Sequence, residues 1–494
     1  MTKGFAPEKS EAAMPSPSVA ETHISTVFFS ADRAYKLLKP LKTSFLDHET
    51  VASRLRAVDE ELALNRRLAP DVYLGTADVI EGGEIVDRFL VMRRLPASRR
   101  ITALVGTDEF PACVRSVARA IAVFHGRQQP APDARELASR DAVRKNWYDN
   151  FTDIEPIIGK VIPVEDADRV KHLVDRFLDH REELFEQRIA MGNVCEGHGD
   201  LTAEDVFCLA EGPRILDCLA FDRRLRVADV LLDVAFLAMD LDRLAGASAA
   251  HDFIAAYCEF SNEHHPPSLA HHYVAYRANV RAKVAAIRYG QGDESQSEVA
   301  RVYHDLCLRH LERAALTAVL VGGTPGTGKS TLAQGLSASL GSMVLTTDEL
   351  RKDLAGRGHL EHQFSATDEG IYREEMTEQT YAELVNRAAT LLDRAESVVL
   401  DASWNRAKHR QLAREMAESK GAEIIEIECR LDPATAKDRI ARRLAQGNDP
   451  SDARPELVDE LRERFEEWPA ATPINTTPNL QVVLQQVLDQ LSFS

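Results

Sequence analysis

One glycine-rich segment constrains the fold of this chain more than any other part of its sequence. The segment is TAVLVGGTPGTGKS at residues 317–330, where a run of branched apolar residues leads straight into the pattern G-x-x-x-x-G-K-S. Glycines allow successive backbone N–H groups to turn inward around phosphate oxygens, and the N-terminal end of a following helix adds positive potential. The sequence therefore predicts a strand, a phosphate-binding loop and a helix start, which together form a P-loop.

The side chains of this loop have separate expected tasks. Lys329 can reach the terminal phosphates of a nucleotide, and the Ser330 hydroxyl can hold Mg²⁺. A chance glycine-rich turn is the alternative, and it is disfavoured because an apolar strand precedes the motif and the helix-like TLAQGLSASL follows it. We expect ATP as the nucleotide, in contact with Gly323, Thr324, Pro325, Gly326, Thr327, Gly328, Lys329, Ser330 and Thr331.

Length, charge and cysteine usage limit the remaining classes. A chain of 494 residues is too long for one ordinary core, which predicts two to four domains. Its net charge of −18 argues against a broad nucleic-acid or anionic-membrane surface. No apolar run approaches the ~20 residues of a membrane helix, and the N-terminus lacks a secretory apolar region. The seven scattered cysteines fit reduced thiols in a cytoplasmic protein.

Two patterns divide the chain. From about residue 318, short apolar runs alternate with helical segments, which predicts a parallel sheet with helices on both faces. The earlier part mixes short strand-like runs with one helix near residues 48–68, and then becomes mainly helical. The expected strands of the later part are residues 319–321, 343–345, 398–400 and 424–427. The fold class is therefore predicted as an α+β bilobal domain followed by an α/β P-loop domain.

The domain boundaries follow from the same patterns. A Pro-, Ser- and Glu-rich start suggests a flexible tail at residues 1–20. The first domain is expected at residues 21–315, with its small lobe ending near residue 95 and a helical lobe after it. The P-loop domain is expected at residues 316–494.

A second cluster of charged residues lies in the first domain. It reads EGHGDLTAEDVFCL at residues 196–209 and is followed by RILDCLAFD at residues 214–222. A hydroxyl that is to be phosphorylated needs a carboxylate to orient it and accept its proton, and Mg²⁺ prefers hard oxygen ligands. The carboxylates of this cluster can supply both functions.

This cluster resembles the aminoglycoside phosphotransferase and kinase-like superfamily, whose catalytic loop reads H-G-D-L-x-x-x-N before a metal-binding Asp. The resemblance implies that Asp200 is the catalytic base, that Asp217 is the principal Mg²⁺ ligand and that His198 braces the loop. Asp205 stands where the family has Asn. An Asp there can still bind the metal, but it adds negative charge to the site.

The resemblance extends to the small lobe and to the helix after the loop. It implies that Lys36 binds the ATP phosphates, that Glu61 is its ion-pair partner and that residues 91–97 hold adenine as a hinge. Asp229 and Asp233 would buttress the catalytic loop. Taken singly, Lys36 and Glu61 could also be surface charges, since Lys39, Lys42 and Glu60 lie nearby.

The P-loop domain has its own candidates for the acceptor. Asp348 and Arg351 follow the expected strand 343–345, at the sheet edge where ligands bind in such folds. They resemble the acceptor-binding Asp and Arg of polynucleotide kinases and zeta toxins, although Asp348 could equally cap the next helix. Asp401, at the end of a buried strand, could hold Mg²⁺ as a Walker B-type carboxylate or bind the acceptor.

Three arginines complete the expected P-loop site. Arg439, Arg442 and Arg443 lie on one helix before the polar loop QGNDPSDARP, which is similar to the lid of small P-loop kinases. One of them, with Arg442 as the candidate catalytic residue, would close on the transferred phosphoryl group. The alternative is a solvated basic helix face.

The order of the two parts resembles a bacterial family that joins an aminoglycoside-phosphotransferase-like domain to an AAA-type P-loop kinase domain. The resemblance implies a bifunctional, ATP- and Mg²⁺-dependent kinase that transfers the γ-phosphoryl group to a hydroxyl of a small molecule. Two alternatives stay open: only the P-loop domain is catalytic while the first selects substrate or regulates, or the protein is a nucleotide-gated signalling module. The acceptor and the oligomeric state are left open.

Overall fold

The computed structural model describes residues 18–22, 24–42, 46–354, 374–446 and 454–491. They form two compact units. The first unit contains the described residues up to Asn150 together with Arg188–His264 and Tyr276–Ala282, and the second contains Phe151–Gln187, His265–Ala275 and the described residues from Lys283 onward. The domain boundary predicted at residues 315/316 stays a prediction, because the second unit also takes in helices that precede it.

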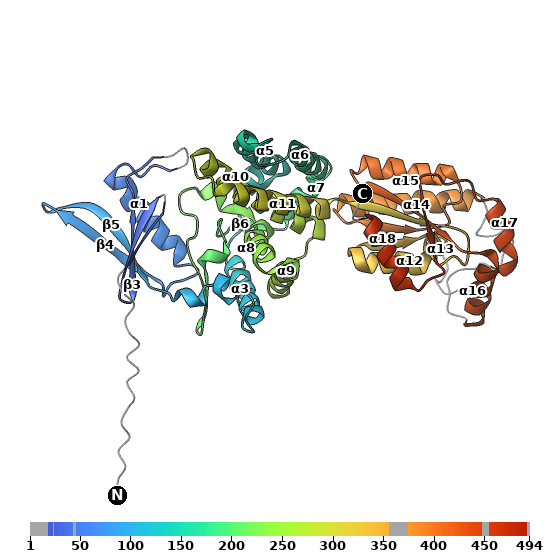
Figure 1. Ribbon diagram of the computed structural model, residues 1–494, viewed down its shortest axis with the longest axis horizontal. Coiled ribbons are helices and arrows are strands. Elements are labelled where there is room, and N and C mark those ends of the chain that lie inside the picture. Colours follow the sequence, from blue (N-terminus) through green and yellow to red (C-terminus); the bar gives the residue numbers. More distant parts are fainter. Residues whose placement is uncertain (1–17, 23, 43–45, 355–373, 447–453, 492–494) are drawn as a thin grey trace, which may run out of the picture. The chain divides into compact units, whose positions relative to one another are not determined.

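The first unit begins with a small lobe in which a helix packs on an antiparallel sheet (Figure 1). The strand order is β1-β2-β3-β5-β4. Thr50 caps the helix by accepting a hydrogen bond from the Ser53 N–H. The elements are β1 Ser18–Glu21, β2 Ser25–Ser30, β3 Arg33–Leu38, α1 Val51–Asn65, β4 Tyr73–Glu81 and β5 Glu84–Arg93.

The buried stripe of α1 differs from the one that the apolar spacing suggests. The sequence places Val51, Leu55, Val58 and Leu62 on one face. In the structure the buried residues of α1 are Arg54, Val58, Glu61 and Asn65, at spacings of four, three and four. Polar side chains are therefore buried beside the apolar stripe, and Glu61 is one of them.

The rest of the first unit is helical, with two short antiparallel strand pairs that carry the loops of interest. The strands β6 and β9 pair with each other, and β7 pairs with β8. These strands are β6 Val194–Glu196, β7 Val206–Leu209, β8 Gly212–Ile215 and β9 Val227–Asp229. Its main helices are α3 Phe110–His125, α5 Arg140–Ile154, which ends in the second unit, α8 Val230–Ala245 and α9 Ala247–Ser261, and α10 Pro267–Gly290 is divided between the units.

The second unit is built around a five-stranded parallel sheet in the order β11-β12-β10-β13-β14. Its strands are β10 Thr317–Gly322, β11 Met343–Thr346, β12 Val398–Asp401, β13 Glu423–Arg430 and β14 Thr472–Asn475. The four strands expected from the apolar runs are present. The fifth, β14, was missed because TPIN is short and only Ile474 of it is buried.

Helices cover both faces of this sheet (Figure 1). On one face, Val319, Val321 and Val399 pack against the apolar residues of α12 and α18 in a single core. The other face is covered by α14 and α15. The helices are α12 Lys329–Leu340, α13 Thr347–Leu354, α14 Glu374–Asp393, α15 Ala407–Ser419, α16 Pro433–Gln446, α17 Val458–Glu463 and α18 Leu480–Leu491. The predicted combination of an α+β bilobal fold with an α/β P-loop fold is confirmed.

Three further helices belong to the second unit although they precede the P-loop. They are α6 Val164–Asp179, most of α7 Glu182–Ala190, and α11 Gln296–Ala314. Arg176 on α6 donates to the Gly421 carbonyl at 2.9 Å and pairs with Glu423 at 2.9 Å. Within the described ranges, no helix is both long and apolar enough to span a membrane.

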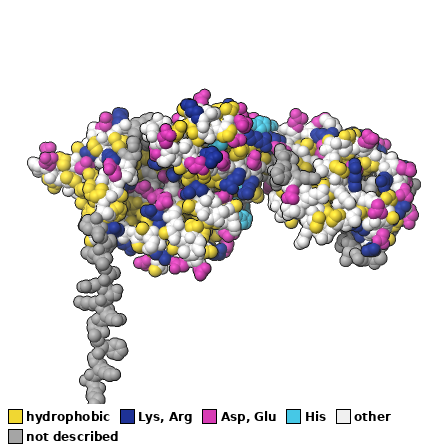
Figure 2. Space-filling model, in the orientation of Figure 1, with side chains coloured by type: hydrophobic (Ala, Val, Ile, Leu, Met, Phe, Trp, Pro, Cys, Tyr) yellow, Lys and Arg dark blue, Asp and Glu magenta, His cyan; other side chains and the backbone are white. Residues whose placement is uncertain are grey.

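Apolar side chains remain exposed on the small-lobe sheet, and Figure 2 shows hydrophobic side chains gathered over these strands. They belong to β1, β2, β4 and β5, and they are Val19, Phe28, Leu74, Ile80 and Ile85. Apolar atoms make up a large share of the surface of most folded proteins.

The expectation of seven reduced thiols is wrong for one pair. Cys113 on α3 and Cys208 on β7 form a disulfide with a Cα–Cα distance of 6.0 Å, and the other five cysteines are free. The two residues are 95 positions apart, and they meet only because α3 packs on the β7–β8 hairpin. Their spacing in the sequence therefore carried no signal.

We expect reduction of this disulfide to lower the free energy of unfolding by about 2–5 kcal/mol, since the bond closes a long loop in the unfolded chain. Urea unfolding with and without dithiothreitol measures the change. The Cys113→Ser variant serves as the control, because its stability should not respond to the reductant. A thiol titration of the denatured, unreduced protein that found all seven cysteines reactive would contradict the bond.

Candidate active sites

Lys36 is the centre of a charge cluster in the small lobe. It lies on β3, paired between Val27 of β2 and Leu90 of β5. Its Nζ donates to Glu61 Oε1 at 2.7 Å and to Asp217 Oδ1 at 2.9 Å. The structure thus brings together three residues that are far apart in the sequence and that were each assigned to nucleotide or metal binding.

The electrostatics of this cluster keep Lys36 charged. Burial opposes its charge, yet the Asp217 and Glu61 carboxylates raise the pKa of Lys36 well above its usual range. The charge of Lys36 in turn lowers the pKa of Asp217. Burial raises the pKa of Glu61, and the nearby Lys36 opposes that rise. A buried lysine between two carboxylates is a ready partner for phosphate oxygens.

The loop that carries Asp200 is fixed by one buried carboxylate. Asp233 on α8 accepts from the His198 N–H and the Gly199 N–H, both at 2.8 Å. His125 lies 3.1 Å from the same carboxylate and holds the Tyr257 hydroxyl at 2.8 Å. Although burial opposes the Asp233 charge, hydrogen bonding from His125 lowers its pKa.

The position of His198 agrees with its expected role of bracing the loop that carries Asp200. Its ring is buried, and burial lowers its pKa, so that the neutral imidazole is favoured. Its Nε2 is 3.0 Å from the Leu216 carbonyl, next to Asp217. Asp229 caps α8 by accepting from the Leu231 N–H at 2.9 Å, and it also pairs with Arg188 at 2.7 Å. The His198 contact therefore joins the two loops of the cluster to each other.

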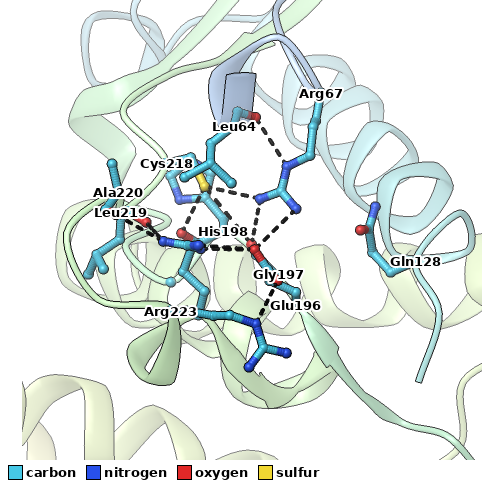
Figure 3. A network of polar contacts seen from close by, with 12 residues as sticks. Leu64, Arg67, Gln128, Glu196, Gly197, His198, Cys218, Leu219, Ala220 and Arg223 are labelled. Atoms are coloured by element: carbon cyan, nitrogen blue, oxygen red, sulfur yellow. Dashed lines mark hydrogen bonds and ion pairs between the residues drawn. The ribbon is translucent and has the colours of Figure 1, made fainter. Parts of the chain in front are cut away.

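A second set of contacts ties this loop to the end of α1 (Figure 3). Arg67 donates through Nη2 to the Gly197 carbonyl at 3.1 Å and to Cys218 Sγ at 3.3 Å. Arg226 pairs with Glu196 at 3.1 Å and donates to the Leu219 carbonyl at 2.8 Å. The sequence offered no signal for Arg67, because it stands outside any recognisable motif.

The carboxylates of the cluster suit a divalent cation. Burial raises the pKa of Asp200, and the nearby positive charge of Arg281 opposes that rise. Burial and then the Asp217 charge raise the pKa of Asp205 to about 7, and Asp205 accepts from the Thr202 hydroxyl at 2.7 Å. A divalent cation near Asp205 would offset the Asp217 charge that raises its pKa. Asp205 and Asp217 therefore fit Mg²⁺ by donor chemistry.

The P-loop of the second unit has the backbone that the motif predicts. Gly323, Gly326 and Gly328 all have positive φ, at 133°, 83° and 87°. A Cβ at Gly326 would lie 2.6 Å from the Ala436 carbonyl oxygen, so no larger residue fits there without a shift. Lys329 begins α12, and its Nζ donates to the Thr324 carbonyl at 3.2 Å.

Asp401 ends β12 beside the start of α12. Burial raises its pKa to about 6, while the Lys329 charge and a hydrogen bond from Ser330 oppose the rise. Ser330 and Asp401 offer oxygen atoms next to each other at the P-loop, which fits a Mg²⁺ site. The structure therefore brings Lys329, Ser330 and Asp401 together.

The acceptor candidates lie on the next helix. Asp348 is in the first turn of α13, and Arg351 Nη1 is 3.3 Å from its Oδ1. The buried Arg351 and the half-exposed Asp348 form an ion pair within one turn. The acidic charges of Asp348 and Glu349 also raise the pKa of Asp401, which places α13 near the same sheet edge.

Two of the candidate arginines of α16, Arg439 and Arg442, lie in different surroundings. Arg439 Nη2 donates to the Thr476 carbonyl at 2.8 Å, and the Thr476 hydroxyl donates to the Thr327 carbonyl at 2.6 Å. The Arg442 side chain is 74% exposed and pairs with Asp438 at 2.5 Å. Of these two, Arg439 is the one joined to the P-loop through Thr476. The part of the expected lid at residues 447–453 is outside the described residues.

We expect Arg439→Ala to raise the KM for ATP about 10-fold, because it removes a charge-assisted contact that braces the P-loop. Arg442→Ala is the matched control on the same helix, and it should change the KM less than twofold. ATP-dependent turnover at varied ATP measures both. A larger effect from Arg442→Ala would restore it as the catalytic candidate.

Three comparisons place the chain among known proteins. The AAA domain family matches residues 319–468, which confirms the P-loop interpretation. Three mycobacterial proteins, one from Mycobacterium bovis and two from strains of Mycobacterium tuberculosis, are each described as uncharacterized. Each is 36% identical to this chain over 465 residues, which is 94% of this chain and 93% of the relative.

Solved structures give weaker likenesses. A choline kinase from Cryptosporidium parvum covers 68% of this chain and 95% of its own, at 10% identity and a TM-score of 0.39. A choline/ethanolamine kinase family protein from Mesorhizobium loti covers 61% and 92%, at 13% identity and a TM-score of 0.38. An APS kinase from Mycobacterium tuberculosis, in complex with AMPPNP and APS, covers 36% and 98%, at 22% identity and a TM-score of 0.28.

Proposed function

This chain belongs to the same family as the uncharacterized mycobacterial proteins, and we propose that it is an ATP- and Mg²⁺-dependent phosphotransferase with one nucleotide site in each unit. The phosphoryl acceptor is the hydroxyl of a small molecule. The observation that carries the proposal is the bridge from Lys36 Nζ to both Glu61 and Asp217, at 2.7 and 2.9 Å. A phosphate-binding cation and a metal-binding carboxylate are thereby held in one place.

In the first unit, Asp200 is the base. The acceptor oxygen attacks the γ-phosphorus while its proton passes to an Asp200 oxygen, and the bond between the γ-phosphorus and the bridging oxygen of ADP breaks. A phosphate ester and ADP result, and the proton then leaves to water. The raised pKa of Asp200 brings it closer to the working pH, which favours proton acceptance. Mg²⁺, when held by Asp217 and Asp205, neutralises charge on the phosphates.

In the second unit, Lys329 and the loop amides bind the phosphates, and Ser330 and Asp401 hold the metal. Asp348 orients the acceptor hydroxyl, and Arg351 fixes Asp348 through the ion pair at 3.3 Å. The positions of these residues at one end of the parallel strands support the assignment, because ligands of open α/β sheets bind there.

The test is turnover with Mg²⁺-ATP and a fractionated small-molecule extract, in which new phosphorylated species are followed by mass spectrometry. Wild type, Asp200→Asn and Lys329→Ala are compared, with Asp141→Asn and Lys437→Ala as surface controls. A product that disappears with only one of the two site variants assigns that reaction to one unit. A product that survives Asp200→Asn but not Lys329→Ala, with no other product found, would leave only the P-loop unit catalytic. ATP binding without any acceptor-dependent product would overturn the proposal in favour of a nucleotide-gated module.

A further inference from the structure

Asp217 has an unusual backbone. Its φ is 62°, in the left-handed region that residues other than glycine rarely adopt. Asp is among the residues that tolerate this region best, but such a conformation still persists only where the surrounding structure enforces it. The Asp217 side chain is 53% exposed, so its own burial does not enforce it.

Two side chains from the small lobe enforce this turn. The Asp217 N–H donates to the Tyr73 hydroxyl oxygen at 3.0 Å, and the next N–H, of Cys218, donates to Asn65 Oδ1 at 2.8 Å. Tyr73 and Asn65 are both buried. Consecutive N–H groups of a strained turn are thus each satisfied by a rigid, buried acceptor.

The same side chains connect the turn to the lysine cluster. Asn65 Nδ2 donates to the Glu61 carbonyl at 2.9 Å, one turn earlier on α1. Leu216, which precedes Asp217, packs against the small-lobe core around Val58 and Tyr73. The last turn of α1 therefore presents Glu61 to Lys36 and, four residues later, holds the backbone that presents Asp217 to Lys36.

A further ion pair involves the strand that precedes the turn. Arg214 on β8 donates through Nε and Nη2 to both oxygens of Asp71, at 2.6 and 3.1 Å. Asp71 lies in the short connection between α1 and β4, next to Tyr73 in the chain. Arg214 therefore fastens this connection to β8, and Arg67 fastens it to Gly197 and Cys218.

We infer that Tyr73 and Asn65 are positioning residues for metal binding, because they hold the strained Asp217–Cys218 turn in the conformation that aims the Asp217 carboxylate at Lys36. The inference rests on the proposed function, in which Asp217 is a Mg²⁺ ligand. Neither residue touches the reacting atoms. Their contribution is to the geometry of the ligand, and partners of this kind typically matter 10- to 100-fold for metal affinity.

Tyr73→Phe is the decisive variant, since it removes only the hydroxyl and leaves the buried ring. Tyr35→Phe is the matched control: Tyr35 precedes Lys36 on β3, and its ring packs edge-on against Phe89 with centroids 6.1 Å apart. Binding of Mn²⁺ by the full chain is measured by electron paramagnetic resonance with a non-hydrolysable ATP analogue, and thermal unfolding is recorded beside it. The Mn²⁺-binding component that disappears in Asp217→Asn is the one that belongs to the site in the first unit.

We expect Tyr73→Phe to weaken that component about 10-fold and Tyr35→Phe to leave it within twofold of wild type. A higher Mg²⁺ concentration should restore the turnover of Tyr73→Phe. It would not do so if the variant had only lost folded protein. Unchanged Mn²⁺ affinity in Tyr73→Phe, with the component still lost in Asp217→Asn, would overturn the inference and leave the proposed function standing. If Asp217→Asn instead kept every Mn²⁺-binding component of wild type, the proposed metal site would be contradicted, and the inference with it.

Discussion

Replacing Asp200 with Asn is expected to lower kcat of the first-unit reaction about 10²–10⁴-fold. The amide keeps the size and hydrogen-bonding shape of the side chain but cannot accept the proton of the acceptor hydroxyl, and general-base catalysis typically contributes that much. The KM for ATP should change little, because the nucleotide contacts assigned to Lys36, Glu61 and Asp217 are untouched. The measurement is the initial rate of ester formation by mass spectrometry at saturating Mg²⁺-ATP.

Asp205→Asn is the informative companion to this variant. It installs the amide that the resembling kinases carry at this position, and it removes a carboxylate whose pKa is raised to about 7 by burial and by Asp217. We expect its turnover to stay within about 10-fold of wild type, since an amide oxygen is still a metal ligand. If Asp200→Asn also retained turnover within that range, Asp200 would not be the base.

The charge cluster of the first unit shows which site residues could be predicted from the sequence. Lys39 and Lys42 were alternative candidates to Lys36 for the phosphate-binding lysine, and no local sequence pattern distinguished the three. The structure separates them by position: Lys39 reaches Glu21 and Lys42 reaches Asp47, both outside the site. The resemblance selected Lys36, and the structure places its Nζ 2.7 Å from Glu61.

Glu61 illustrates what amphipathic spacing alone misses. An apolar stripe predicts which face of a helix is buried, but α1 buries Arg54, Glu61 and Asn65 on a polar line beside Val58. Each of these polar residues has a specific partner: Arg54 pairs with Asp87 at 2.9 Å, and Asn65 accepts from Cys218. Buried polar groups need such partners, and partners distant in the sequence leave no periodic signal.

The parallel sheet was the easier part to predict. Its central strands β10 and β12 are almost continuous buried apolar runs, because helices cover both faces of the sheet. The edge strand β14 does not follow this rule, since it is short and mostly exposed. The positioning role of Tyr73 could not be predicted from the sequence either. It depends on one hydroxyl that accepts a hydrogen bond from the Asp217 N–H, 144 residues later in the chain.

Replacing Lys329 with Ala is expected to lower kcat/KM for ATP in the second-unit reaction about 10²–10³-fold. Lys329 supplies the side-chain cation that lies on the P-loop, with its Nζ 3.2 Å from the Thr324 carbonyl. A preorganised donor aimed at the charge of the transferring phosphoryl group is typically worth that much. Its loss should also raise the pKa of Asp401, since the Lys329 charge opposes the effect of burial there. Initial rates at varied ATP give kcat/KM.

Lys437→Ala is the matched control for this prediction, because Lys437 lies on α16 in a surface ion pair with Asp459 at 2.6 Å. Its kcat/KM should stay within twofold of wild type, as expected for the loss of an exposed pair. Since each unit has its own lysine and carboxylates, Lys329→Ala should leave the product lost in Asp200→Asn intact. If Lys329→Ala abolished both products, the two units would not work independently, and the first unit would depend on nucleotide bound at the P-loop.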